Sequence, residues 1–209
     1  MTVERFRVTL TLIEEMLGTA ASDAGIYEDY IARRAGRADT SDELASLPPE
    51  ELVERGTSVF RRGPDGAPCI FDYQIKGFFK DACGSLRKAD NTRSAKLAGF
   101  KKAIDGLLFV EPRIIPIAMP PGGAVGVCVR PLRAATMQGE RVSLARSETV
   151  PADSTLAFDV VLLSSDLVEL MAEWLDYGRL RGLGQWRNSG KGRFTAVVER
   201  IRTPSVVGR

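Results

Sequence analysis

The part of this chain that most constrains its fold is residues 178–194, GRLRGLGQWRNSGKGRF, here called the glycine-rich segment. It holds five glycines and five cationic side chains within seventeen residues. The residues before it have the apolar periodicity of an amphipathic helix, and those after it alternate as a strand does. A helix must therefore connect to a closing strand through a backbone that glycine allows to adopt positive φ and to approach other segments closely.

Two interpretations of the glycine-rich segment fit its composition. The first is a loop that binds a phosphate-bearing ligand, with single-stranded nucleic acid favoured because the Trp186 ring can stack on a base. The second is a tight structural turn with solvated charges, in which Trp186 covers the core. A P-loop is excluded, since the spacing Gly-x-x-x-x-Gly-Lys-Ser/Thr is absent and the segment follows a helix instead of opening one.

The composition is that of a soluble globular domain, and it excludes several kinds of site. The 209 residues include no histidine, which excludes His-based general acid–base catalysis, His-activated nucleophiles and His-containing metal sites. The three cysteines are far apart in the sequence, so neither a zinc site nor a disulfide framework is indicated. The chain has no apolar run near the roughly 20 residues of a membrane span and no signal-peptide pattern. We therefore expect a cytoplasmic protein with no membrane partner.

The net charge of +2 is unevenly distributed along the chain. Residues 1–55 carry twelve acidic and six basic side chains, a net charge of −6, so the remainder carries +8. This asymmetry allows one face of the protein to be basic and to attract nucleic acid. A basic cluster in the middle of the chain either contacts RNA from a hairpin or pairs with local acids; it comprises Arg130, Arg133, Arg141 and Arg146.

The apolar patterns predict an α+β fold. Strands are expected at residues 6–13, 59–60, 69–71, 107–110, 113–118, 125–129, 142–147, 155–163 and 194–201. Helices are expected at residues 22–34, 49–56, 74–88 and 94–104, and in a segment that begins after a capping Asp166 and runs to the glycine-rich segment. This order is compatible with a ferredoxin-like β-α-β-β-α-β core that carries insertions.

The same residue patterns predict that the chain forms one domain. Its expected extent is residues 1–202, with a helical insertion at 20–56 and a large strand-rich insertion at 107–150. Residues 203–209 are expected to form a flexible tail.

Two separate motifs resemble those of the RAMP superfamily of CRISPR-associated RNA-binding proteins, in particular its backbone subunits. The first covers residues 56–88, where Asp65-Gly66 and Ala67-Pro68 resemble a charged turn and residues 73–77, YQIKG, resemble the start of the following helix. The second is the glycine-rich segment, which resembles the family's glycine-rich loop between a helix and the last strand. The resemblance implies a core like a modified RNA-recognition motif, with the helix start at Lys76 and the glycine-rich segment facing an RNA backbone.

The sequence also departs from the family pattern. Residues 71–74 are FDYQ where the family has Pro-Gly-Ser-Ser, so the hydroxyl groups are lost. No aspartate lies near Gly56, where target-cleaving relatives have one, and the histidine used by transcript-processing relatives is absent. These departures argue against nucleolytic activity. They leave two alternatives open, a subunit of an ordinary CRISPR complex and a stand-alone or phage-borne member of the superfamily.

The predicted site is a groove between the helix start and the glycine-rich segment, where backbone N–H groups and cationic side chains meet RNA phosphates. The residues assigned to it are Lys76, Lys80, Arg181, Gly182, Gly184, Trp186, Arg187, Gly190, Lys191 and Gly192. No cofactor, metal or catalytic residue is assigned.

The leading prediction is thus a non-catalytic RNA-binding protein, whose partners are single-stranded RNA or single-stranded DNA and, by self-assembly or docking, copies of itself or CRISPR effector subunits. One alternative is a phage-encoded mimic or inhibitor of a CRISPR effector that acts through protein–protein contacts. Another is a metal-dependent nuclease that uses the early carboxylates Asp23, Glu28 and Asp29 as oxygen ligands.

Overall fold

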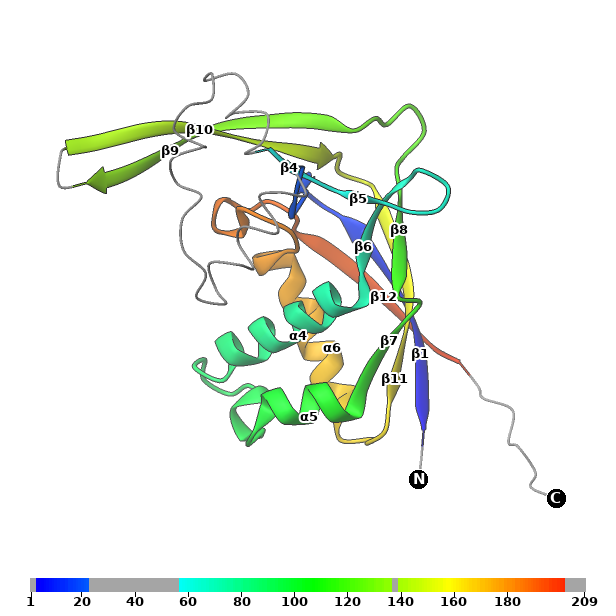
Figure 1. Ribbon diagram of the computed structural model, residues 1–209. Coiled ribbons are helices and arrows are strands. Elements are labelled where there is room, and N and C mark those ends of the chain that lie inside the picture. Colours follow the sequence, from blue (N-terminus) through cyan, green and yellow to red (C-terminus); the bar gives the residue numbers. More distant parts are fainter. Residues whose placement is uncertain (1–2, 23–56, 137–138, 202–209) are drawn as a thin grey trace, which may run out of the picture.

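The computed structural model describes residues 3–22, 57–136 and 139–201. In these ranges the chain forms a mixed α/β structure with two largely antiparallel sheets (Figure 1). The larger sheet has the order β12 (Phe194–Ile201), β1 (Glu4–Leu12), β11 (Thr155–Leu162), β8 (Ile114–Ala118), β6 (Pro68–Phe71) and β5 (Arg61–Arg62), with β7 (Leu108–Glu111) also paired to β11. The second sheet has the order β2 (Met16–Leu17), β10 (Gly139–Val150), β4 (Ser58–Val59) and β3 (Ala20–Ala21), with β9 (Gly126–Thr136) paired to β10.

Three helices lie together on one face of the larger sheet (Figure 1). They are α4 (Asp72–Leu86), α5 (Phe100–Leu107) and α6 (Leu167–Arg181). Two short 3-10 turns, η1 (Ser94–Lys96) and η2 (Arg187–Ser189), complete the described helical structure.

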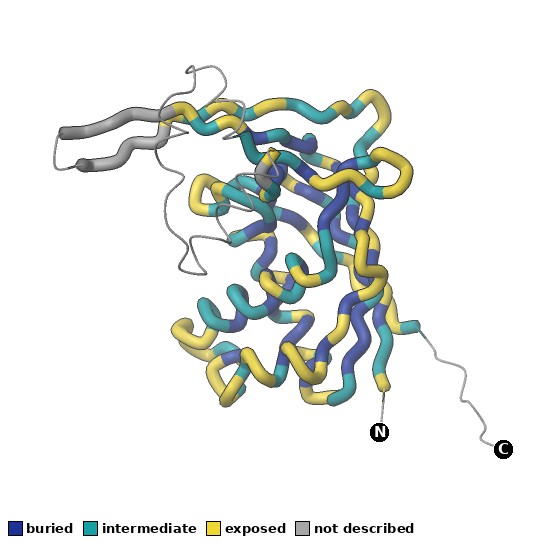
Figure 2. Tube along the Cα trace, in the orientation of Figure 1, coloured by how far each residue is buried: buried dark blue, intermediate teal, exposed yellow. Residues whose placement is uncertain are grey.

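The core fills the layer between the sheet and the helices. Every second side chain of β1 from Phe6 to Leu12 is buried, as the alternation in the sequence predicts for a strand with one covered face. Aromatic contacts connect the helices to each other and to the sheet: the ring of Phe79 lies 5.7 Å from that of Trp174, and Phe78 lies 5.2 Å from Phe194. The buried strand and helix faces meet in this layer, while the outer helix surfaces are exposed (Figure 2).

One buried polar group ties the 3-10 turn η1 to α6. The indole N–H of Trp174 donates to Ser94 Oγ at 2.9 Å, and this hydroxyl in turn donates to Glu173 at 2.5 Å. The backbone N–H groups of Arg93 and Ser94 also donate to the Glu173 carboxylate. The polar end of a buried tryptophan is therefore satisfied in the core, as such groups must be.

The second sheet is continuous with the first through the chain itself. Strand β1 leads into β2 after a bend at residues 13–15, and β10 leads into β11. Strands β9 and β10 form a long hairpin, paired from Gly126↔Thr149 to Thr136↔Gly139, that projects away from the helices (Figure 1).

Most predicted elements are confirmed, and the last strand has the predicted bounds. The single helix expected at residues 94–104 is wrong: η1 and α5 are separate because Gly99 adopts a left-handed φ of 59° that a helix cannot contain. The cap expected at Asp166 is also wrong, since its side chain makes no capping bond and Leu167 N donates to Ser164 O instead. Strands β9 and β10 are longer than predicted.

Several expectations fall on other parts of the chain. The helices expected at residues 22–34 and 49–56, most of the insertion at 20–56, and the tail at 203–209 lie outside the described residues. No helix in the described ranges is long and apolar enough to cross a membrane.

Alanine substitutions at two helical glycines distinguish the effect of close packing on stability from the effect of helix propensity. A Cβ on Gly178 would overlap the Phe194 ring, so we expect Gly178→Ala to lower the free energy of unfolding by about 1–3 kcal/mol through overpacking. A Cβ on Gly77 has no described atom within 4 Å, so Gly77→Ala should raise that free energy by about 0.5–1 kcal/mol. Urea unfolding of both variants checks the pair, and equal effects would contradict the packing of Phe194 on α6.

Candidate functional site

The glycine-rich segment is packed against the bend that follows β1. A Cβ on Gly184 would lie 2.6 Å from the Leu17 carbonyl oxygen, and one on Gly192 would overlap the Leu183 carbonyl. Leu183 N donates to Gly192 O at 2.8 Å, and Gly192 N donates to Glu15 O at 2.8 Å. Glycine is thus required here by close backbone approach.

The other glycines assigned to the site also have left-handed φ. Gly182 has φ 75° and Gly190 has φ 86°. Gly182 faces the backbone of residues 191–193, whereas the nearest atom to a Cβ on Gly190 would be a side-chain nitrogen of Arg193 at 3.5 Å. Gly182 therefore closes the segment on itself, and Gly190 lies at its open side.

Two arginines of the segment share one carboxylate on α4. Arg181 Nε lies 3.0 Å from Asp81 Oδ2, and Arg187 Nη1 lies 2.9 Å from the same oxygen. The hydrogen bond to Asp81 raises the pKa of the Arg181 guanidinium. Arg181 Nη1 also donates to Asn188 Oδ1 at 2.7 Å, which fixes the 3-10 turn η2.

Two further cations of the segment pair with the bend after β1, while Arg179 pairs with Asp176 on its own helix. Lys191 Nζ lies 2.6 Å from Glu15 Oε1, and Arg193 Nη2 lies 3.3 Å from Glu14 Oε1. The hydrogen bond to Glu15 raises the pKa of the Lys191 ammonium. Much of the positive charge in the segment is therefore offset by carboxylates of the same chain.

Trp186 connects the segment to the hairpin. It has a left-handed φ of 55°, which is uncommon for a residue other than glycine, and it is 42% exposed. The Arg130 guanidinium of β9 lies 4.9 Å from the centre of its ring, a cation–π distance. Arg130 Nη2 donates to Gln185 Oε1 at 3.2 Å, and Gln185 Nε2 donates to Ser58 Oγ at 3.1 Å. Two strands of the second sheet, β9 and β4, therefore contact the segment.

Arg130, a member of the middle basic cluster, reaches the site. Its Nε and Nη1 atoms are buried and have no hydrogen-bond partner among the described residues. Such groups are rare in folded proteins because an unpaired buried donor is costly.

Lys76 and Lys80 do not join the glycine-rich segment. Lys76 Nζ donates to Asp105 O at 3.1 Å and lies 5.1 Å from the centre of the Phe109 ring, while Lys80 Nζ lies 2.5 Å from Asp105 Oδ1. Burial lowers the pKa of Lys76, and the hydrogen bond from Lys80 lowers the pKa of Asp105. The expectation that both lysines face the groove is corrected here: this face of α4 turns toward α5 and β7.

A hollow does lie between α4 and the glycine-rich segment. Its volume is about 290 Å³, and it is bordered by Leu17, Gln74, Gly77, Phe78, Gly184 and Arg187, among others. Of the residues assigned to the site from the sequence, Gly184 and Arg187 line it.

A second hollow of about 220 Å³ adjoins the first, since both include Thr19, Phe60 and Gln74. Its other walls include Arg61, Phe71 and Tyr73. We call the two hollows together the groove. It extends from the glycine-rich segment to the first turn of α4.

The residues that shape the second hollow were not predicted as site residues from the sequence. Gln74 Oε1 accepts the N–H of Phe71 at 2.8 Å, and Gln74 Nε2 donates to Thr19 Oγ1 at 2.8 Å. The signal was present, because a glutamine three residues into a helix is a frequent capping partner of the residue before the first turn.

The helix start is less suited to an anion than the sequence suggested. The carboxylate of Asp72 accepts the N–H of Tyr73 at 2.8 Å and lies 3.9 Å from Arg113 Nη1. A negative side chain therefore already lies at the positive end of the helix dipole.

The described residues include no group of three or more His, Cys, Asp or Glu side chains that could hold a metal ion. Asp23, Glu28 and Asp29, the carboxylates of the nuclease alternative, lie outside the described ranges. Cys69 and Cys83 are buried free thiols, and burial raises the pKa of each.

Alanine substitutions at two glycines with left-handed φ distinguish the stability cost of backbone strain from the additional cost of a steric overlap. Gly190→Ala should lower the free energy of unfolding by about 1 kcal/mol, the cost of an alanine in that conformation. Gly192→Ala should cost more, about 3 kcal/mol, because its Cβ would also overlap the Leu183 carbonyl. Thermal and urea unfolding measure both, and equal losses would contradict the close packing at Gly192.

The Lys191–Glu15 pair predicts a pH dependence at the alkaline end. The folded-state pKa of Lys191 lies above the usual 10.5, so the pair stabilises fully below about pH 10.5 and its contribution is lost as pH rises through the higher folded pKa. Lys191→Met should therefore lower the free energy of unfolding by about 1 kcal/mol or less at pH 8, and the difference from the unaltered protein should shrink above pH 10.5. Urea titrations of both proteins across this range test it. A difference that stays constant would rule out the ion pair as its source.

Comparison with known proteins shows that this chain is similar to solved structures in its fold alone. The sequence matches no protein-family model and no curated protein. A chain of the Type III-B Cmr-beta bound to cognate target RNA, solved by cryo-EM, superposes with a TM-score of 0.57 at 13% identity, over 96% of this chain and 61% of that one. This chain therefore spans about three fifths of that chain's length.

Two further structures give weaker superpositions. A chain of a Type IV-B CRISPR complex has a TM-score of 0.49 at 14% identity, covering 98% of this chain and 94% of that chain. Cmr6 from Pyrococcus furiosus has a TM-score of 0.48 at 12% identity, covering 94% and 100%. The likeness to the Cmr-beta chain supports a RAMP-like fold of mixed α/β type with antiparallel sheets.

Proposed function

We propose that this protein is a CRISPR-related RNA-binding protein that holds single-stranded RNA in the groove beside the glycine-rich segment. Its fold is shared over 96% of its length with a chain of a complex described as bound to cognate target RNA. That likeness supports an RNA ligand over a DNA ligand, and it supports CRISPR effector subunits or further copies of this chain as protein partners.

The observation that carries the proposal is the position of Arg187 and Gly184 on the wall of the first hollow. The close packing of Gly184 against the Leu17 carbonyl fixes this wall of the hollow, and Arg187 supplies a cation whose carboxylate partner it shares with Arg181. Two guanidinium groups on one carboxylate leave a net positive charge at the edge of the groove. A guanidinium binds a phosphate group well because two of its N–H groups can donate to phosphate oxygens at once.

The ion pairs also limit how much of the affinity is electrostatic. Of the cations in the segment, Lys191 and Arg193 each have their own carboxylate partner. Few cations are therefore available to release counterions from RNA, and the salt dependence should be shallow. Shape and base stacking, including on Trp186, would supply the rest.

The proposal includes a ferredoxin-like core and a single domain. The order β12–β1–β11–β7, with α4 and α6 on one face, supports the ferredoxin-like, RNA-recognition-motif-like core. We extend the proposal to a single RAMP-like domain over residues 1–202, in which the insertion expected at 107–150 begins after the core strand β7 and the hairpin of β9 and β10 is its projecting part.

The proposed protein is non-catalytic and either stand-alone or phage-borne. The absence of histidine from the 209 residues supports the first point, since it removes the commonest general acid–base side chain. RNA held by such a protein would be bound, protected or presented, with its chain left intact.

Loss of Arg187 tests the site directly. Arg187→Gln should weaken single-stranded RNA binding roughly fivefold and lower the slope of log affinity against log salt by about 0.7, the value for one phosphate contact on a single strand. Fluorescence anisotropy with a labelled oligonucleotide at several salt concentrations measures both quantities.

A matched control removes a different ion-paired arginine. Arg200 pairs with Glu4 on the outer edge of the sheet, away from the groove, so Arg200→Gln should leave both affinity and salt slope unchanged. An Arg187 variant that binds like the unaltered protein would refute the site. Absence of RNA binding by the unaltered protein would refute the function and direct attention to docking on CRISPR effector proteins.

A further inference from the structure

We propose that Tyr73 is a stacking platform for one nucleobase, at the end of the groove away from the glycine-rich segment. The inference rests on the proposed function, because the base would belong to the RNA held in the same groove. It adds a second contact point that neither the sequence motifs nor the fold comparison assigns.

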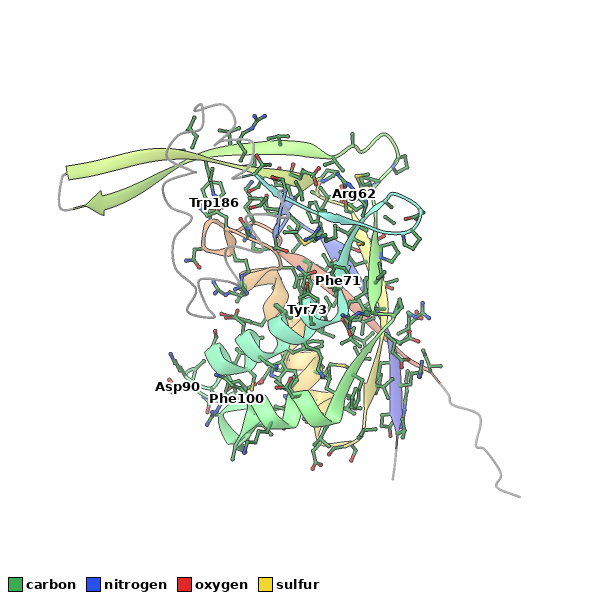
Figure 3. The ribbon with its side chains drawn as sticks, in the orientation of Figure 1. Arg62, Phe71, Tyr73, Asp90, Phe100 and Trp186 are labelled. Carbon is green, nitrogen blue, oxygen red and sulfur yellow. The ribbon has the colours of Figure 1, made fainter. Side chains whose placement is uncertain are left out.

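The platform is built from two parallel rings. The Tyr73 ring lies 5.5 Å from the Phe71 ring with an interplanar angle of 10°, so the two form an offset stack. Phe71 is partly buried, whereas Tyr73 is 58% exposed. Figure 3 shows the pair together at the start of α4. Phe71 therefore backs Tyr73 from the protein side and leaves the tyrosine open to solvent.

The backbone under the platform is held in place. Tyr73 lies in the first turn of α4, and its N–H donates to Asp72 Oδ1 at 2.8 Å. Phe71 N donates to Gln74 Oε1 across the same turn. A ring carried on a fixed backbone and already stacked on one side loses little conformational freedom when a base covers it.

The surroundings fit a base that is attached to a phosphate chain. Tyr73 lines the second hollow, which adjoins the hollow beside Arg187 and Gly184. Arg61 borders the same hollow and is exposed, and it has no ion pair with any residue in the described ranges. A nucleotide whose phosphate lies near Arg61 can place its base on Tyr73 while neighbouring nucleotides continue toward Arg187.

The polar groups in the second hollow are already hydrogen-bonded within the protein, so we expect the hollow to recognise a base by stacking on its face instead of by hydrogen bonds to its edge. The amide of Gln74 is engaged at both ends, by Phe71 N and by Thr19 Oγ1. The Cys69 thiol donates to the Arg61 carbonyl at 3.2 Å. Since these groups are occupied, the platform should accept all four bases, with purines favoured by their larger stacking area.

A double-mutant cycle between protein and RNA tests the platform. The probe is a labelled single-stranded RNA in which each position in turn is made abasic, titrated against the unaltered protein, Tyr73→Ala and Tyr73→Phe. We expect Tyr73→Ala to weaken binding about tenfold and Tyr73→Phe to retain affinity, because the ring makes the contact. One abasic position should cost the unaltered protein a similar factor and cost Tyr73→Ala nothing further.

Val197→Ala is the matched control, since it removes part of an exposed apolar side chain of β12 that borders neither hollow. It should bind as the unaltered protein does, and thermal unfolding should show all three variants folded. If Tyr73→Ala binds normally, or if its loss adds fully to every abasic loss, the platform is refuted while RNA binding remains. If the unaltered protein binds no RNA, the proposed function itself fails. Equal losses for single-stranded DNA would show that the platform does not distinguish the sugars.

Discussion

The backbone contact between the glycine-rich segment and the bend after β1 is the constraint on which the rest of the structure depends. Ile13 N donates to Arg193 O at 2.7 Å, Gly192 N donates to Glu15 O, and Gly184 lies against the Leu17 carbonyl. The bend is also where the chain passes from the larger sheet to the second one. The same contact thus links the two sheets and positions one wall of the groove, so a structural role of the segment is compatible with the proposed binding role.

The ion pairs of the glycine-rich segment hold its cationic side chains in fixed positions. Asp81 holds two arginines of the segment, and Glu14 and Glu15 hold two more cations. Partly exposed pairs of this kind add little stability each, but together they hold in place the part of the segment between its two buried apolar residues, Leu183 and Phe194. The proposed RNA-binding surface would then present a defined shape with modest excess charge, and the aromatic faces at both of its ends would contribute correspondingly more to binding.

Local sequence patterns predicted the elements well, because alternation and helical spacing are properties of single segments. They also found the glycine-rich segment and its position between α6 and β12. The direction of Lys76 and Lys80 was not predictable, since it depends on where α5 and β7 pack against α4. The Phe71–Tyr73 stack was missed for a similar reason: a tyrosine two residues after a phenylalanine gives no sign of which ring will be exposed. Gly99, which divides η1 from α5, shows that a helical pattern can continue across a residue that ends the helix.

The hairpin of β9 and β10 has a consequence for how this protein can vary. Strand β10 pairs with β2 and β4 only near its end, at Ser147, Thr149 and Val150, and from Gly139 to Arg146 its ladder partner in the described chain is β9 alone. Adding or removing two residues from each strand would therefore change the reach of the hairpin while every side chain kept its face. An odd number of residues added to only one of the two strands would shift the pairing and move side chains beyond the insertion to the opposite face.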